Sequence, residues 1–129
     1  MEVVAGGGLC GDIRFEALGQ PLRVGIYHCL ECRKHHGAVI YAAAVFRAVN
    51  VTVRGETRSF NGRHFCPRCG SSVFARSGED IEVHLGSFDE TDRFIPTYEL
   101  WATRRESWLP AFPVRSYERD RDENRPSET

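Results

Sequence analysis

Short stretches of the chain alternate apolar with polar residues, and this period of two is the pattern of half-buried β-strands. The clearest example is residues 12–17, where Ile13 and Phe15 alternate with charged residues. Other stretches show the same alternation or are rich in β-branched and aromatic residues, which favour strands. We expect strands at residues 2–5, 12–17, 22–28, 49–54, 57–60, 73–75, 81–85 and 97–101. The pattern predicts a mainly β fold.

Two stretches depart from this alternation. Residues 38–46 are apolar nearly throughout, which favours a buried strand, although a helix is the alternative because so short a run does not separate the two. Residues 29–36 are followed by Gly37, so we expect about two helical turns that the glycine ends in the left-handed conformation. Asn61 and Gly62 predict a tight hairpin turn, since both residues tolerate positive φ.

The chain of 129 residues has the length of a single domain, and we expect that domain to span residues 1–113. From Arg115 onward nearly every residue is charged or polar. Such a segment buries too little apolar area to offset the entropy lost on ordering. Residues 114–129 are therefore expected to form a charged, flexible tail.

The formal net charge is −1, which implies no broad basic surface and argues against a nucleic acid partner. No apolar run approaches the length that crosses a membrane. The first residues have neither a basic head nor an apolar signal core. These features predict a cytoplasmic protein without a membrane partner.

The five cysteines lie at or beside predicted turns. They form three clusters: Cys10, the pair Cys29 and Cys32, and the pair Cys66 and Cys69. An odd number of cysteines fits free or metal-bound thiols better than a disulfide framework. The alternative for Cys10 and Cys29 is a role as small buried hydrophobic residues, which free cysteines often have.

The turn Cys66-Pro67-Arg68-Cys69-Gly70 has the form of a zinc knuckle. Proline fixes one φ angle and glycine permits a reversal, so both sulfurs face one side, as a tetrahedral zinc site needs. A C-P-x-C sequence also occurs in dithiol redox centres. Those lie where a strand enters a helix, whereas residues 70–75 indicate a turn into a strand, so zinc is favoured. Together with Cys10 the turn supplies three ligands. The fourth ligand could be His64, His28 or a sulfur of the middle pair, Cys29 and Cys32.

The middle pair lies in the stretch richest in reactive side chains. Arg33 and Lys34 follow Cys29 and Cys32 directly, and their positive charge favours thiolate and attracts an acidic ligand. The alternative is a solvated helix face with two half-exposed cysteines.

The histidines carry weaker signals. His35 and His36 are adjacent on the expected helix and point apart, so we expect them at the surface. His84 alternates with apolar neighbours on an expected strand, so we expect a structural histidine with satisfied hydrogen bonds.

Three motifs in succession resemble one protein family: Gly8-Leu9-Cys10-Gly11, His28-Cys29-Leu30-Glu31-Cys32-Arg33 and His64-Phe65-Cys66-Pro67-Arg68-Cys69-Gly70. They are similar to the glutathione-dependent formaldehyde-activating enzyme family, which includes the centromere protein V-like domains. The segments at residues 84–89, 96–101 and 108–110 resemble the family's later motifs. With order and spacing kept, the resemblance extends over residues 3–113.

This resemblance implies a β-tent fold with two zinc sites. The family holds a structural zinc with a C-x-C and a C-x-x-C, and a catalytic zinc with a C-x-C-x-x-C. Residue by residue, the structural set carries over to Cys10, Cys66 and Cys69, and the catalytic set to Cys29 and Cys32.

The resemblance also implies a carbon–sulfur lyase that acts on adducts of glutathione and formaldehyde, such as S-hydroxymethylglutathione. A small thiol such as glutathione is then the expected partner. Cys29 and Cys32 would be catalytic ligands or thiol contacts, and Arg33 and Lys34 would bind carboxylates of the substrate.

The chain departs from the family pattern at two positions. Gly8 stands where the first cysteine of the C-x-C would be, and Tyr27 where the first of the C-x-C-x-x-C would be. An uncharged phenol is a poor zinc ligand near neutral pH, so we expect one bound zinc rather than two. The alternatives to a lyase are a non-catalytic zinc module that binds a protein partner or a small thiol, and a thiol–disulfide protein.

Overall fold

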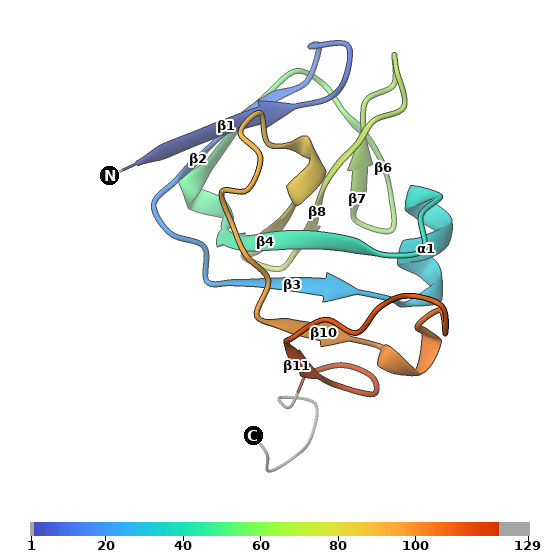
Figure 1. Cartoon of the computed structure of the whole chain (residues 1–129). Helices are drawn as coiled ribbons and strands as arrows, with labels where there is room; N and C mark the ends of the chain where they lie inside the picture. The colour runs from blue at the N-terminus through green and yellow to red at the C-terminus, as the bar shows by residue number, and fades with distance from the viewer. Residues whose placement is uncertain (1, 122–129) are drawn as a thin grey trace.

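The computed structural model describes residues 2–121 and is mainly β, as predicted, with one short helix (Figure 1). A smaller sheet has the strand order β1 (Val3–Gly7), β2 (Arg14–Leu18), β5 (Val51–Arg54). A larger sheet has the order β11 (Arg115–Ser116), β10 (Tyr98–Leu100), β3 (Arg23–Tyr27), β4 (Tyr41–Arg47), β9 (Asp80–His84), β8 (Ser72–Ser77), β7 (Arg63–Phe65), β6 (Arg58–Phe60). Helix α1 (Leu30–His36) joins β3 to β4. The helices in residues 2–121 are too short and polar to span a bilayer.

Side chains from both sheets form the main hydrophobic core. Phe15 of β2, Phe46 of β4 and Phe74 of β8 are its largest fully buried members. The alternation read from the sequence is visible in β2, where Phe15 is buried and Glu16 is exposed. Burying one such aromatic side chain stabilises the fold by about 1.5–3 kcal/mol, so the core fixes how the two sheets meet.

Helix α1 and strand β4 agree with the sequence pattern. The helix ends at Gly37, whose φ of 64° lies in the left-handed region and whose N–H donates to the carbonyl of Arg33. Residues 43–46 of β4 are buried, so the strand interpretation of this apolar stretch is confirmed and the helical alternative is excluded. In Figure 1, α1 lies at one end of β3 and β4.

The expected hairpin turn joins β6 to β7. Asn61 and Gly62 have φ of 50° and 79°, and Phe60 pairs with Arg63 across the turn. Strand β7 then leads into the cysteine turn, which is closed by a hydrogen bond of 2.8 Å from the N–H of Gly70 to the carbonyl of Cys66. The turn therefore lies at one end of the β7–β8 hairpin.

The C-terminal part of the sheet differs from expectation. We expected the last strand at residues 97–101 and a tail from residue 114, but β11 pairs in parallel with β10. The N–H of Tyr117 donates to the carbonyl of Glu99, and the N–H of Trp101 to that of Arg119, each at 2.9 Å. Backbone pairing of this kind does not require apolar side chains, so the charged composition misled the prediction. Residues 122–129 of the expected tail lie outside the described residues.

Candidate metal centre

Three cysteine sulfurs converge at one end of the two sheets. Cys10 comes from the loop between β1 and β2, and Cys66 and Cys69 come from the turn between β7 and β8. All three sulfurs lie within 4.8 Å of one another, and those of Cys10 and Cys66 are 3.6 Å apart. Cys66 is buried and Cys69 is exposed. The structure thus brings together the three thiols predicted as one ligand set, in an arrangement that could hold a metal ion.

Hydrogen bonds hold the two turns of this three-cysteine group against each other. The N–H of Gly8 donates to the carbonyl of Ile13 at 3.0 Å, which closes the first loop. The N–H of Leu9 donates to the hydroxyl of Ser71 at 2.8 Å, which links the first loop to the second turn. Two segments distant in the sequence are thereby fixed in register around the sulfurs.

The donor chemistry of the three-cysteine group fits zinc. Hydrogen bonds from the hydroxyl and backbone N–H of Ser71, and from the backbone N–H of Cys10, lower the pKa of Cys69 to about 6. The Cys69 side chain is therefore largely a thiolate near neutral pH. Zinc binds thiolates readily and takes three or four protein ligands, so Cys10, Cys66 and Cys69 are suited to hold it.

None of the expected fourth ligands joins the group among residues 2–121. His64 is 2.8 Å from the hydroxyl of Thr57 through its Nδ1 and stacks on Phe74. His28 is fully buried and contacts Glu99 at 2.7 Å through its Nε2. The hydroxyl of Thr57 and the carboxylate of Glu99 occupy these two histidines in this structure, and a fourth ligand from His64, His28 or the middle pair stays a prediction.

The sulfurs of Cys29 and Cys32 are joined to each other by a disulfide bond, with Cα atoms 5.3 Å apart. Cys29 is the N-cap of α1, and Cys32 is buried on the helix. Neither thiol is free in this state. Their predicted roles as metal ligands or catalytic thiols require the reduced pair and stay a prediction.

Tyr27 packs in the same apolar cluster as Cys32 and Tyr98. Its hydroxyl lies 3.1 Å from that of Tyr98, and burial raises the pKa of Tyr27 well above its usual range. The phenol therefore stays neutral at physiological pH and offers no anionic oxygen to a metal. Tyr27 fills, as a packing residue, the place that the family pattern gives to a thiol.

A cavity of about 410 Å³ adjoins Cys29 and is also lined by Glu31, Trp101, Arg104 and Asp120. Sequence reasoning did not single out Arg104, because this residue lies on η3 (Ala102–Arg104), 75 positions after Cys29 in the chain.

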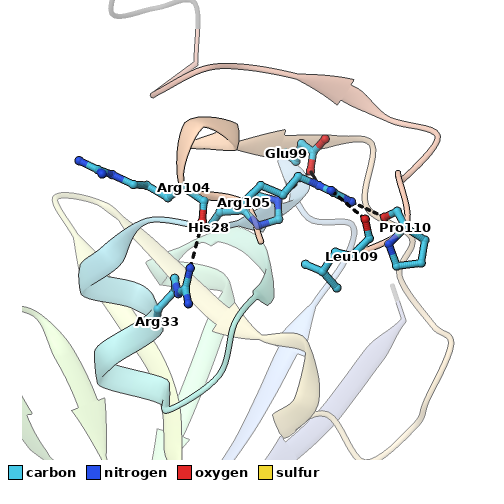
Figure 2. Close-up of polar contacts among 7 residues, drawn as sticks. All are labelled: His28, Arg33, Glu99, Arg104, Arg105, Leu109 and Pro110. Atoms are coloured by element: carbon cyan, nitrogen blue, oxygen red, sulfur yellow. Dashed lines mark hydrogen bonds and ion pairs between the residues drawn. The ribbon is translucent and has the colours of Figure 1, made fainter. Parts of the chain in front are cut away.

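The two basic residues predicted beside the middle pair do not line the cavity at Cys29. Figure 2 shows Arg33 reaching from α1 to the carbonyl of Arg104, at 3.0 Å, and Arg33 also pairs with the carboxylate of Glu106. Lys34 lines a different cavity, of about 350 Å³, with Gly37. The positive charge of Arg33 is thus compensated within the fold.

A polar network runs from the buried residues His28 and Glu99 to the segment that follows β10 (Figure 2). The carboxylate of Glu99 on β10 contacts His28 and lies 3.6 Å from Nε of Arg105. Arg105 in turn donates to the carbonyls of Leu109, at 3.0 Å, and Pro110. The network fixes the end of β3, and with it the start of α1, against the segment that follows β10.

A second cavity, of about 580 Å³, lies beside the turns that carry the three-cysteine group. Gly8 and Ser71 line it, and so do four aromatic side chains: His36, Tyr41, His84 and Phe88. The ring centroids of His36 lie 4.1 Å from Tyr41 and 4.5 Å from His84. Desolvation lowers the pKa of His36 to about 4 and that of His84 to about 3. Both imidazoles are therefore neutral near pH 7.

These positions correct one expectation and agree with another. His36 was expected at the surface with His35, but it packs between Tyr41 and His84. His84 is buried, with its Nδ1 3.2 Å from the hydroxyl of Ser72, as expected of a structural histidine. No local pattern reveals this cavity, since its wall comes from four separate segments of the chain.

Comparison with known proteins identifies the family. The profile of the family described as glutathione-dependent formaldehyde-activating enzyme matches residues 3–104. No curated protein matches the chain. Among solved structures, a crystal structure of a Rhodobacter sphaeroides protein is similar, with a TM-score of 0.52 and 23% identity over 69% of this chain and 91% of that one. At this identity the structural likeness shows the fold alone. The family match spans most of the sequence and both cysteine turns, so the chain belongs to the glutathione-dependent formaldehyde-activating enzyme family.

Proposed function

We propose that the protein is a zinc-binding carbon–sulfur lyase that acts on adducts of a small thiol, such as glutathione, with formaldehyde. The observation that carries this proposal is the three-cysteine group within a chain of this family. Zinc would be held by Cys10, Cys66 and Cys69, whose sulfurs already lie together. Because its free thiols need a reducing compartment, we place the protein in the cytoplasm.

The reaction that this proposal assigns is reversible and needs no oxidant. The adduct R–S–CH₂–OH loses its hydroxyl proton, its carbon–sulfur bond breaks, and formaldehyde and a thiolate result. A zinc ion held at the reduced middle pair would stabilise such a thiolate and lower the pKa of its thiol. In the reduced protein, Cys29 and Cys32 would contact the adduct sulfur or take part in binding a metal.

The cavity beside Cys29 supports this placement of the substrate. Arg104 offers a guanidinium that can bind a substrate carboxylate in bidentate fashion. Glu31 and Asp120 line the same cavity, and a carboxylate can accept the hydroxyl proton. Arg33 and Lys34 stay predicted contacts for substrate carboxylates, Arg33 after its release from Glu106.

The test is exchange NMR spectroscopy with ¹³C-formaldehyde and glutathione, under reducing conditions and with zinc supplied. We expect the protein to accelerate exchange between free formaldehyde and S-hydroxymethylglutathione above the spontaneous rate. The Cys29→Ser and Cys32→Ser variants should lose the acceleration, but they should keep the zinc of the three-cysteine group. An equal rate with and without folded, zinc-loaded protein would contradict the lyase proposal.

A second candidate is a non-catalytic zinc module that binds a small thiol or a protein partner. The replacement of a family thiol by the buried Tyr27 favours it, because two thiols without a third ligand hold zinc weakly. In this case the NMR experiment shows no acceleration. Zinc analysis would still give about one ion per chain, lost in Cys69→Ser.

A further inference from the structure

The disulfide of the middle pair joins a partly exposed cysteine to a buried one. Cys29 lines the cavity of about 410 Å³, whereas Cys32 is 8% exposed and packs with Tyr27, Tyr98 and Leu100. Reactive cysteines are typically partly exposed, and cysteines buried in the fold are shielded from reagents. A small thiol that enters the cavity therefore meets Cys29 first, and Cys32 stays behind it in the apolar cluster.

Position 27 leaves this pair without a third sulfur. A dedicated zinc site takes three or four protein ligands, but Tyr27 offers only a buried hydroxyl, which lies 3.1 Å from that of Tyr98. The group of three metal-binding side chains found in residues 2–121 does not include Cys29 or Cys32. Their sulfurs are bonded to each other instead, and the C-x-x-C spacing also occurs in dithiol redox centres.

The charges in the cavity wall decide which thiols it takes. Glu31 in this wall pairs with Arg63 at 3.0 Å. Asp120 accepts a hydrogen bond of 3.0 Å from the indole N–H of Trp101. Both carboxylates are thus engaged by donors within the fold, and Arg104 adds a guanidinium to the same wall. The cavity therefore favours a small thiol that carries carboxylates.

We infer that Cys29 and Cys32 form a thiol–disulfide exchange site for a small acidic thiol and its disulfide, an activity that needs neither the metal nor the formaldehyde of the proposed lyase. The substrate thiolate attacks the sulfur of Cys29. A mixed disulfide forms there, and the bond to Cys32 breaks with its electron pair on the Cys32 sulfur, which takes up the proton. A second thiol then attacks the substrate sulfur of the mixed disulfide. In sum, the protein disulfide and two R–SH give the protein dithiol and R–S–S–R, and the reverse reaction reoxidises the pair.

The test equilibrates the full chain with glutathione and glutathione disulfide at a series of ratios, alkylates the free thiols and maps them by peptide mass spectrometry. We expect Cys29 and Cys32 to change together from disulfide to dithiol as the ratio rises, and to return when it falls. A pair that stays oxidised at every ratio is a structural crosslink and overturns the inference. Protection of the reduced pair from glutathione disulfide by added zinc would make it a metal site and would overturn the inference too.

Two variants test the order of attack. In Cys32→Ser, one glutathione should accumulate on Cys29 after treatment with glutathione disulfide, because no neighbouring thiol displaces it. In Cys29→Ser only the buried thiol is left, and its labelling should be about tenfold slower. Equal labelling of the two variants would overturn the assigned roles. Peptide mapping separates these adducts from glutathione on the exposed Cys69.

Arg104→Gln tests the recognition of carboxylates. Reduction of the pair by glutathione should slow about tenfold, because a charge-assisted hydrogen bond is lost. Reduction by 2-mercaptoethanol, which has no carboxylate, should keep its rate. Arg58→Gln, on the exposed edge strand β6, is the matched control and should react like the natural chain with both thiols. Equal slowing of Arg104→Gln with both thiols would overturn the preference for an acidic thiol. Absence of lyase activity leaves all these results unchanged, so the two proposals fail separately.

Discussion

Replacing Tyr27 by cysteine should create a second metal site at the middle pair. Residues two apart on an extended strand point to the same side, so position 27 shares its side with Cys29, and Tyr27 packs in the same cluster as Cys32. In the reduced protein the variant would present three thiols in the C-x-C-x-x-C arrangement. We expect bound zinc to rise from about one to about two ions per chain.

The change also destabilises the metal-free fold, because Tyr27 is a buried packing residue. Tyr27 is 8% exposed, and shortening a buried aromatic side chain costs about 3 kcal/mol. The hydroxyl of Tyr98 loses its partner at 3.1 Å, which adds about 1 kcal/mol. The metal-free variant should therefore unfold about 4 kcal/mol more easily. Zinc at 1,000 times its dissociation constant would restore about the same amount.

Urea unfolding with and without zinc, beside metal analysis, measures both effects. Tyr27→Ser is the matched control, because it leaves nearly the same cavity and no thiol. We expect Tyr27→Cys and Tyr27→Ser to be equally destabilised without zinc, and only Tyr27→Cys to recover when zinc is added. Tyr27→Phe keeps the packing and should lose only the hydroxyl contribution, about 1 kcal/mol.

A folded, fully reduced Tyr27→Cys variant that binds no more zinc than Tyr27→Ser would contradict a second metal site. Position 27 would then not face the middle pair closely enough to complete a site. If zinc restored the stability of both variants equally, the metal would act through the three-cysteine group alone.

Three further predictions test other parts of the molecule. Cys69→Ser should lower bound zinc from about one ion per chain to nearly none, by metal analysis, and should lower the melting temperature because metal binding contributes to folding. Deletion from Arg115 onward should cost about 2 kcal/mol in thermal unfolding, because the backbone hydrogen bonds of β11 and Tyr117 to β10 are lost; an unchanged melting temperature would show that the pairing adds nothing. His84 is neutral when folded, with a pKa lowered to about 3, but protonates below its ordinary pKa when unfolded. The contribution of His84 to the free energy of unfolding is therefore complete above pH 6.5 and falls by about 2 kcal/mol from pH 7 to pH 5. In urea titrations, the His84→Asn variant should lose less stability over this pH range than the natural chain.

Local rules explain what could be predicted from the sequence. Gly37 ends α1, and Asn61 with Gly62 turns β6 into β7, because each conformation depends on residues that tolerate positive φ. The alternation around Phe15 predicted strand β2 and its buried face, because successive side chains on a strand point to opposite sides. The set Cys10, Cys66 and Cys69 was predicted from two glycine-bounded turns together with the family resemblance, because turns alone do not show which distant thiols converge.

The features that sequence reasoning missed depend on contacts between distant segments. Strand β11 is two residues long and is held by backbone hydrogen bonds, which composition does not reveal. The cavity beside Ser71 exists because β4 and β9 bring Tyr41 and His84 next to the end of α1. Arg104 reaches Cys29 only after β10 pairs with β3. Such pairings are properties of the topology and leave no trace in short windows of sequence.

The pairing of β3 with β10 limits how early the larger sheet can form while the chain is being synthesised. Tyr27 and Tyr98 are 71 positions apart in the chain, so at ribosomal speed β3 waits roughly 4 to 14 s for its partner strand. Cys10 and Cys66 are 56 positions apart and wait roughly 3 to 11 s. Throughout that interval the early thiols are uncovered and accessible to oxidants and to passing metal ions. The three-cysteine group can hold a metal with all three sulfurs only after Cys69 has been synthesised.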